Sequence, residues 1–195
     1  MADSMHEWHD VLDFWFGVPG TPEYGTQRDI WFVKKDATDA QIRERFLGLH
    51  ARAHAGDLVH WQDEPGSLLA LIVVLDQFSR NLFRGQATSF ASDAQALAGA
   101  RLMVARGWDL QLPTVQRAFV YLPYEHCENL PTQEEALRLF ERVLDDPQGA
   151  GLLDWARKHH EVIRRFGRFP HRNQILVRVS TPEEIAFLAQ PGSRF

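Results

Sequence analysis

The chain has 195 residues, of which 45% are hydrophobic and 24% are charged, and its formal net charge is -5. This length suits a single domain over residues 1–195 with a substantial buried core, and the composition excludes a disordered chain. The excess of acid argues against nucleic acid as a partner, because a phosphate backbone is bound by a basic surface.

No segment of the sequence indicates a membrane protein or a secreted protein. The longest apolar run, Leu68 to Leu75, is far shorter than the roughly 20 residues that a membrane span needs. The stretch from Met1 to Trp8 is acidic and does not resemble a signal peptide. A single cysteine, Cys127, allows no internal disulfide, which suits a reducing compartment. We therefore expect a soluble, cytoplasmic protein without a membrane partner.

Apolar residues recur at helical spacing along the whole chain and predict an all-α protein. Short loops would let neighbouring helices stack as antiparallel hairpins in a compact superhelical array, although no internal repeat of fixed period supports it. The one weak strand-like alternation covers residues 175–179. The expected helices, about eight of them, cover approximately residues 4–16, 38–55, 67–84, 89–106, 113–128, 131–146, 151–166 and 182–189.

Local signals predict where several helices begin, end or bend. Thr38 with Gln41 and Thr181 with Glu184 have the spacing of a capping box, which marks a helix start. Pro113 is expected as the first residue of its helix. Pro123 falls inside that same helix, so a kink or a break is expected there.

The stretch from Ser67 to Gly85 is expected to be the central helix. Its apolar run leads into a polar end without losing helical spacing. One stripe of the helix stays apolar throughout, whereas the neighbouring stripe changes to Asp76, Arg80 and Arg84. We expect the polar end to be enclosed as well, and to form the centre of the molecule.

Three segments embed charged residues among large apolar ones, namely 75–84, 121–128 and 159–173. A buried charge must be paired and hydrogen-bonded, so these groups either satisfy one another or await a ligand. The candidate ligand-binding residues are Asp76, Arg80, Asn81, Arg84, Glu125, His126, Glu128, His159, Arg168, His171, Arg172 and Asn173.

Within this set, the spacing suggests particular pairings. Asp76 and Arg80 are four residues apart in the favourable order for a helical ion pair. Arg84 has no acid four residues before it, which favours a two-pronged contact to a carboxylate or a phosphate. His126 lies between Glu125 and Glu128, an arrangement that raises its pKa or fixes its tautomer.

Two alternatives stay open for several of these residues. His126, like His159 on the apolar stripe of its helix with Trp155, is either a general acid or base or a hydrogen-bonded core histidine. Arg168 and Arg172 either serve a functional loop or cap the C-termini of helices.

The sequence indicates neither a metal site nor a cofactor. It contains no second cysteine and no pair of histidines in a His-Glu-x-x-His pattern. Cys127 next to His126 does not make a nucleophile, since adjacent residues of a helix point apart, and we interpret Cys127 as structural.

Long motifs resemble those of an uncharacterised bacterial family, domain of unknown function 924. They are Val11 to Gly17, Trp31-Phe32, Leu75 to Gly85, Leu122 to Glu128, Gln133-Glu134, Arg165 to Asn173 and Ser180 to Glu184. The resemblance covers nearly the whole chain and implies an all-helical fold grouped with tetratricopeptide-like superhelices, but no activity. The chain departs from the family pattern at Cys127, where Ser is usual, and at Val177, where Gly precedes Arg.

Three functions are compatible with these observations. The first, which we favour, is a binding module for an anionic small molecule or a peptide, and it predicts that at least two of the arginines lack an acidic partner. The second is a hydrolase or transferase with His126 or His159 as general base. The third is a structural polar network that fixes how the helices dock, with the partner surface elsewhere. The sequence indicates no oligomeric state.

Overall fold

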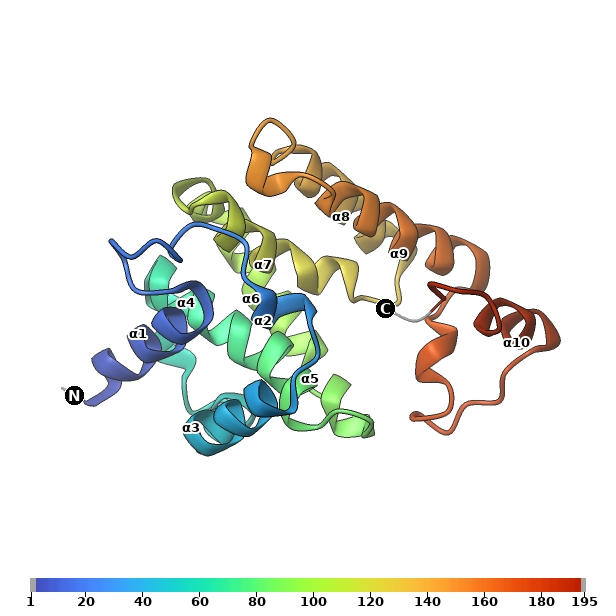
Figure 1. The fold of residues 1–195 in the computed structure, drawn as a ribbon, viewed down its shortest axis with the longest axis horizontal. Coiled ribbons are helices and arrows are strands. Elements are labelled where there is room, and N and C mark those ends of the chain that lie inside the picture. The colour runs from blue at the N-terminus through green and yellow to red at the C-terminus, as the bar shows by residue number, and fades with distance from the viewer. Residues whose placement is uncertain (1–2, 194–195) are drawn as a thin grey trace.

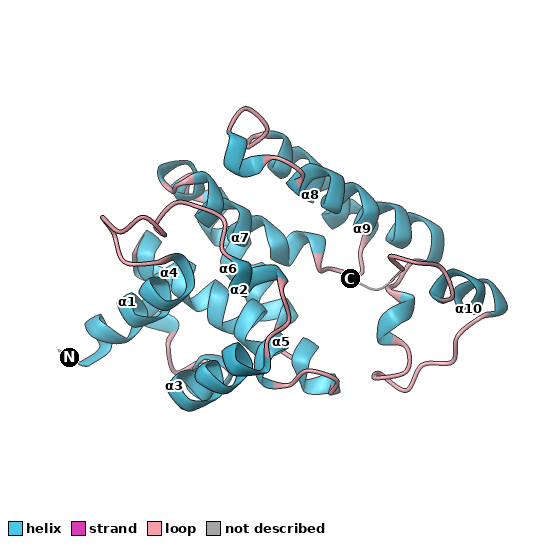
Figure 2. Cartoon of the chain, in the orientation of Figure 1, coloured by secondary structure: helices cyan, strands magenta, loops and turns pink. Residues whose placement is uncertain are grey.

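The computed structural model describes residues 3–193 and, among these, every side chain except those of residues 3–6 and 32. The described chain is helical without a strand, which confirms the all-α prediction and excludes the weak strand signal at 175–179 (Figure 2). The α-helices are α1 (Asp3–Phe16), α2 (Asp29–Phe32), α3 (Asp36–Ala55), α4 (Pro65–Val73), α5 (Ser79–Leu82), α6 (Asp93–Ala105), α7 (Thr114–Glu125), α8 (Leu130–Glu141), α9 (Leu152–Phe166) and α10 (Pro182–Leu188).

The central helix consists of α4, a π-helix (Val74–Phe78) and α5 in direct succession. Residues 67–76 are buried without exception, so this part of the helix faces core on all sides rather than on one. A helix that is apolar all round is stable only when other elements enclose it. Here α1 and α6 pack against α4, and α3 packs against the π-helix and α5 (Figure 1).

The second half of the chain is a stack of consecutive helices. Helix α6 packs on α7, α7 on α8 and α8 on α9, and α10 lies at the far end of the molecule (Figure 1). Stacking of sequence neighbours is the arrangement that the short loops predict. That residues 1–195 form one domain, and that the stack belongs with tetratricopeptide-like superhelices, stay predictions.

Some of the predicted helix ends agree with the structure and others do not. Thr181 and Glu184 form the expected capping box at the start of α10. Thr38 is no cap, however, because α3 already begins at Asp36, two residues earlier. Pro113 precedes α7 as its N-cap residue, and α7 continues through Pro123, so the predicted break is absent.

Val177 has a strained backbone. Its φ of 54° lies in the left-handed region, which a β-branched residue adopts at a cost, and its side chain is 92% exposed and gains nothing from packing. The turn is held by the Arg178 N–H, which donates to the carbonyl of Asn173 at 2.8 Å. The glycine that is usual here in the resembling family is therefore explained by φ, without a close backbone approach.

Replacing Val177 by glycine is expected to raise the melting temperature, because glycine adopts this φ without a steric penalty. The strain costs about 1–3 kcal/mol, and the extra chain entropy of glycine offsets roughly 0.5–1 kcal/mol of the relief. A net gain of about 1 kcal/mol corresponds to roughly 2–4 °C in a thermal melt of a chain of this size. Val179→Gly is the control, since Val179 is also exposed but has no positive φ. A Val177→Gly variant that melts no higher than the wild type contradicts the strain.

Candidate functional site

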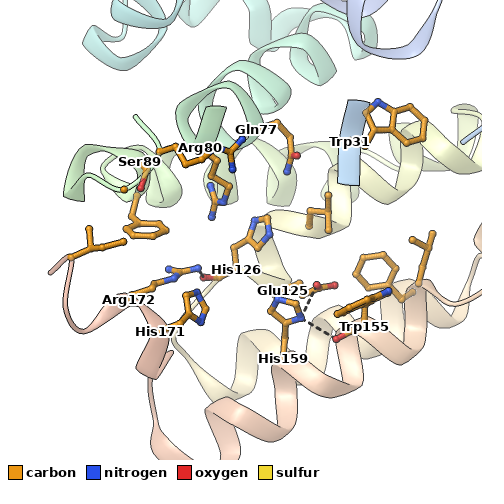
Figure 3. A pocket seen from close by; sticks show the side chains of 17 residues that line it. Trp31, Gln77, Arg80, Ser89, Glu125, His126, Trp155, His159, His171 and Arg172 are labelled. Atoms are coloured by element: carbon orange, nitrogen blue, oxygen red, sulfur yellow. Dashed lines mark hydrogen bonds and ion pairs between the residues drawn. The ribbon is translucent and has the colours of Figure 1, made fainter. Parts of the chain in front are cut away.

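A cavity of about 520 Å³ opens beside the polar end of the central helix (Figure 3). Its volume and mixed lining are typical of sites for small molecules. The polar residues in its wall are Gln77, Arg80, Arg84, Ser89, Glu125, His126, His159, His171 and Arg172, and the others are Trp31, Gly85, Phe90, Leu122, Phe140, Leu152, Trp155 and Ile175. Seven of the predicted site residues therefore line one cavity.

Asp76 lies directly behind the cavity wall and is only 1% exposed. It belongs to the π-helix, a rare geometry that occurs frequently at functional sites. Its carboxylate is 2.6 Å from Gln77 Nε2, 2.8 Å from His126 Nδ1 and 3.0 Å from Arg80 Nη1. Burial alone raises the pKa of Asp76, but the charge of Arg80 and the hydrogen bonds from His126 and Gln77 outweigh it and hold the pKa well below its usual range. The predicted ion pair of Asp76 with Arg80 is thereby confirmed.

The contact with Asp76 sets the tautomer of His126. Because the carboxylate of Asp76 is ionised and only accepts, His126 Nδ1–H donates, and Nε2 of the neutral ring has a lone pair. Burial, reinforced by the charge of Arg80, lowers the pKa of His126, so the ring is neutral at neutral pH. Among the described residues, no hydrogen bond to Nε2 is found. The tautomer is fixed as predicted, but by Asp76 instead of Glu125 and Glu128, and the alternative of a raised pKa is wrong.

A second histidine in the cavity wall is held in the same way. His159 Nδ1 lies 2.9 Å from Glu125 Oε1 and 2.9 Å from the carbonyl oxygen of Trp155. A carbonyl oxygen only accepts, so His159 Nδ1 carries the proton. The ring centroids of His126 and His159 are 6.3 Å apart (Figure 3). Two imidazoles, each oriented by a buried carboxylate, thus share one cavity.

Two arginines in the wall share a single acid. Arg80 donates Nη1 and Nη2 to the two carboxylate oxygens of Asp93, at 3.0 and 3.2 Å. Arg172 Nη1 also donates to Asp93, at the longer distance of 3.3 Å. Burial and the charge of Arg80 lower the pKa of Arg172 to about 10. The positive charge of Arg172 is therefore less fully compensated than that of Arg80.

Arg172 is clamped in place and only 6% exposed. Its guanidinium carbon lies 4.5 Å from the ring centroid of Phe90 and 4.6 Å from that of Phe169, distances at which cations are attracted to aromatic faces. Nη2 donates to the carbonyl oxygen of His126, the C-cap residue of α7, so the capping interpretation holds for Arg172. Its Nε–H is buried, and no acceptor for it is found among the described residues.

The prediction that at least two arginines lack an acidic partner is wrong. Arg84 makes the expected two-pronged contact to a carboxylate, but it is that of Asp39, at 2.9 and 3.0 Å. Arg168 makes a similar contact with Glu184 at 2.7 and 2.8 Å. These acids are distant in sequence from their arginines, so no helical spacing could reveal them.

Besides Asp76, which lies behind the wall, four predicted residues do not line the cavity and do not belong to the candidate site. Asn81 donates to Asp39. The other three, Glu128, Arg168 and Asn173, belong to a network under α10 that also includes Arg178 and Glu184. This network satisfies its own charges and holds α10, so its role in the structure is to dock the C-terminal segment.

Sequence reasoning missed Gln77 and Asp93 and misjudged Trp155. Gln77 follows Asp76 directly and donates to it, a contact that helical spacing does not predict. Trp155 was placed on the apolar stripe of its helix and not among the site residues, yet it is 51% exposed and lines the cavity. Cys127 is half-buried, and burial raises the pKa of its thiol, which agrees with a structural role.

Within the described part of the chain, no group of three or more His, Cys, Asp or Glu side chains is arranged to hold a metal ion. Three arginines in the wall also disfavour a cation. Every helix of residues 3–193 is too short or too polar to cross a lipid bilayer.

The fold and the cavity thus define an all-α protein with a charged, partly aromatic cavity beside its central helix. The family model described as "Bacterial protein of unknown function (DUF924)" matches residues 11–192, and the chain belongs to this family. A solved structure of a protein of unknown function from Agrobacterium tumefaciens is similar, with 37% identity and a TM-score of 0.85, over 96% of this chain and 99% of that one. No curated protein sequence matches. Function must therefore be argued from the cavity.

The network under α10 predicts how the unfolding free energy changes at acidic pH. Hydrogen bonds from Arg168 hold the pKa of Glu184 at about 2, below its ordinary value of 4.5. The unfolded chain therefore binds a proton more readily, and the stability that Glu184 contributes is complete above about pH 4.5 and is lost as the pH falls toward 2. The difference in unfolding free energy between wild type and Glu184→Gln, measured with denaturant, is expected to shrink from pH 7 to pH 3.

The control is Glu183→Gln, because Glu183 is exposed and its ion pair with Arg165 lies at the surface. Such pairs contribute little, so this variant is expected to stay close to the wild type at each pH. A difference for Glu184→Gln that stays constant or widens on acidification contradicts the assignment.

Proposed function

We propose that the protein binds a small molecule with an anionic oxygen group, a carboxylate or a phosphate, in the cavity beside the central helix. The group would lie against Arg172, next to Arg80 and His126. The sequence predicted a binding module for a small molecule or a peptide. The proposal restricts the ligand to a small molecule and the site to the predicted residues that line the cavity.

The single observation that carries the proposal is the incomplete hydrogen bonding of Arg172, which lines the cavity. Its guanidinium has five N–H donors, and among the described residues it makes only two hydrogen bonds, to Asp93 and to the carbonyl oxygen of His126. An oxygen anion within reach of the guanidinium would accept charge-assisted hydrogen bonds from the remaining donors. The partial compensation of Arg172 by a shared Asp93 supports the same conclusion, because an added anion would stabilise its charge.

A second function is favoured by one observation, the lone pair on Nε2 of His126. A neutral imidazole oriented by an ionised carboxylate is a competent general base. The ligand would then be a substrate that donates a proton to His126, as in the predicted hydrolase or transferase. Ser89 is not its nucleophile, since its hydroxyl donates to the carbonyl of Gln86 at 2.7 Å.

Several predictions from the sequence are independent of this proposal and stay predictions. They concern a cytoplasmic location, the absence of nucleic acid and membrane partners, and membership of the tetratricopeptide-like group.

A thermal-shift comparison of matched anionic and neutral compounds tests the proposal. Benzoate and phenyl phosphate are expected to raise the melting temperature, and benzyl alcohol and phenol are not, because only an anion satisfies Arg172. Arg172→Lys keeps a cation but loses the planar guanidinium and its additional N–H donors, and one charge-assisted hydrogen bond is worth about 1.5 kcal/mol or more. Binding of the anions is expected to weaken about tenfold or more in this variant, at constant ionic strength.

Two further variants distinguish a loss of the ligand contact from a loss of binding caused by misfolding. Ile175→Trp fills part of the cavity, keeps every charge and is expected to abolish the shift. Arg168→Lys is the matched control, because it makes the same exchange at an arginine that is paired with an acid but lies outside the cavity. If no anion stabilises the wild type, or if Arg168→Lys weakens binding as much as Arg172→Lys, the proposal is wrong.

A further inference from the structure

The cavity is lined by two unlike groups whose hydrogen bonding is incomplete among the described residues. One is the guanidinium of Arg172, which only donates and makes two hydrogen bonds with five N–H donors, and the other is Nε2 of His126, which in this tautomer only accepts. A lone carboxylate or phosphate satisfies the first group and places an acceptor toward the second. The two groups together therefore require a ligand with an acceptor and a donor.

The donor requirement follows from the surroundings of His126. The titratable and charged groups near His126 are Asp76 and Arg80 on the central helix, Glu125 on its own helix, His159 on α9, and His171 and Arg172 after α9. Asp76 occupies Nδ1 and fixes the proton there, and burial together with the charge of Arg80 opposes a second proton on the ring. A ligand that meets Nε2 must therefore bring its own hydrogen.

The cavity also has an apolar end. Trp31 and Trp155 lie on the far side of His126 and His159 from Arg172 (Figure 3). The indole Nε1–H of Trp31 is already bound to the carbonyl oxygen of Trp15, at 2.8 Å. Lys158 Nζ lies 4.1 Å from the ring centroid of Trp155 and covers one face of the indole, and the half-exposed ring has a second face that an apolar group can contact.

We propose that the ligand is an amphiphilic hydroxy acid: its anionic group binds Arg172, its hydroxyl donates to Nε2 of His126, and an aromatic or apolar body lies toward Trp31 and Trp155. This deepens the proposed function and rests on it. An amine hydrogen would serve the same acceptor, but a protonated amine is disfavoured, because Arg80, Arg84 and Arg172 line the cavity.

Four compounds that differ by one group each test the inference by calorimetric titration of the whole chain. They are 3-phenyllactate, 3-phenylpropanoate without the hydroxyl, 2-phenylethanol without the carboxylate, and lactate without the ring. Both enantiomers of phenyllactate, and 3-hydroxy-3-phenylpropanoate, are measured separately, since the cavity is chiral and the hydroxyl must meet one nitrogen. At least one hydroxy acid is expected to bind about five- to tenfold more tightly than 3-phenylpropanoate, and the other two compounds more weakly.

The variant His126→Leu then tests whether the preference for the hydroxy acid depends on His126. In His126→Leu the hydroxy acid and 3-phenylpropanoate are expected to bind equally, and His60→Leu, at an exposed histidine outside the cavity, is expected to keep the preference. The comparison of compounds needs only the wild type, so it stands even if His126→Leu fails to fold.

The possible failures are distinguishable. If 3-phenylpropanoate binds as tightly as every hydroxy acid, the inference is overturned while anion binding stands. If phenylethanol binds as tightly as the acids, both the inference and the proposed function are overturned. If none of the acids binds, the inference is overturned, and the proposed function is overturned as well if phenyl phosphate fails to stabilise the protein. A preference that survives in His126→Leu also overturns the assignment to His126.

Discussion

The structure depends on one costly arrangement, an ionised carboxylate buried in the middle of the central helix. Asp76 loses its hydration on folding, and that loss is tolerable only if donors replace the water. Gln77, Arg80 and His126 supply these donors from two different helices. The buried charge therefore fixes how α7 lies against the central helix, and it orients an imidazole at the same time. Stability and a chemically competent site follow from the same contacts.

The local helix geometry belongs to this arrangement. The π-helix that carries Asp76 disturbs the regular ladder of backbone hydrogen bonds. Side chains donate hydrogen bonds to the backbone carbonyl oxygens there. Ser92 donates to the carbonyl of Leu75 at 2.7 Å, and Arg80 donates to that of Asp76 at 2.8 Å. Such irregularity is retained where the surrounding contacts determine it, which agrees with a site at this position.

Two polar networks of similar composition have different consequences. The network under α10 is complete, since Glu184 is 2% exposed and is bonded by Arg168, Asn173 and the backbone of Thr181. The network at the cavity leaves the Nε–H of Arg172 without an acceptor among the described residues. A network in which every polar group is hydrogen-bonded is accounted for by a structural role. An incomplete network beside a cavity requires a ligand or a water to complete its hydrogen bonds. This difference separates the candidate site from residues of the same types elsewhere.

The sequence alone determined the all-α class, the polar end of a buried central helix, the Asp76–Arg80 pair, the capping box of α10 and the family. These features depend on neighbours within a few residues, where helical geometry converts spacing directly into contact. Only the tertiary structure decided which acid meets which arginine, that Asp76 rather than Glu125 holds His126, and that Arg168 lies outside the cavity. Those choices join residues that are more than ten positions apart, and the chain's path through the core, which no local period encodes, brings them together.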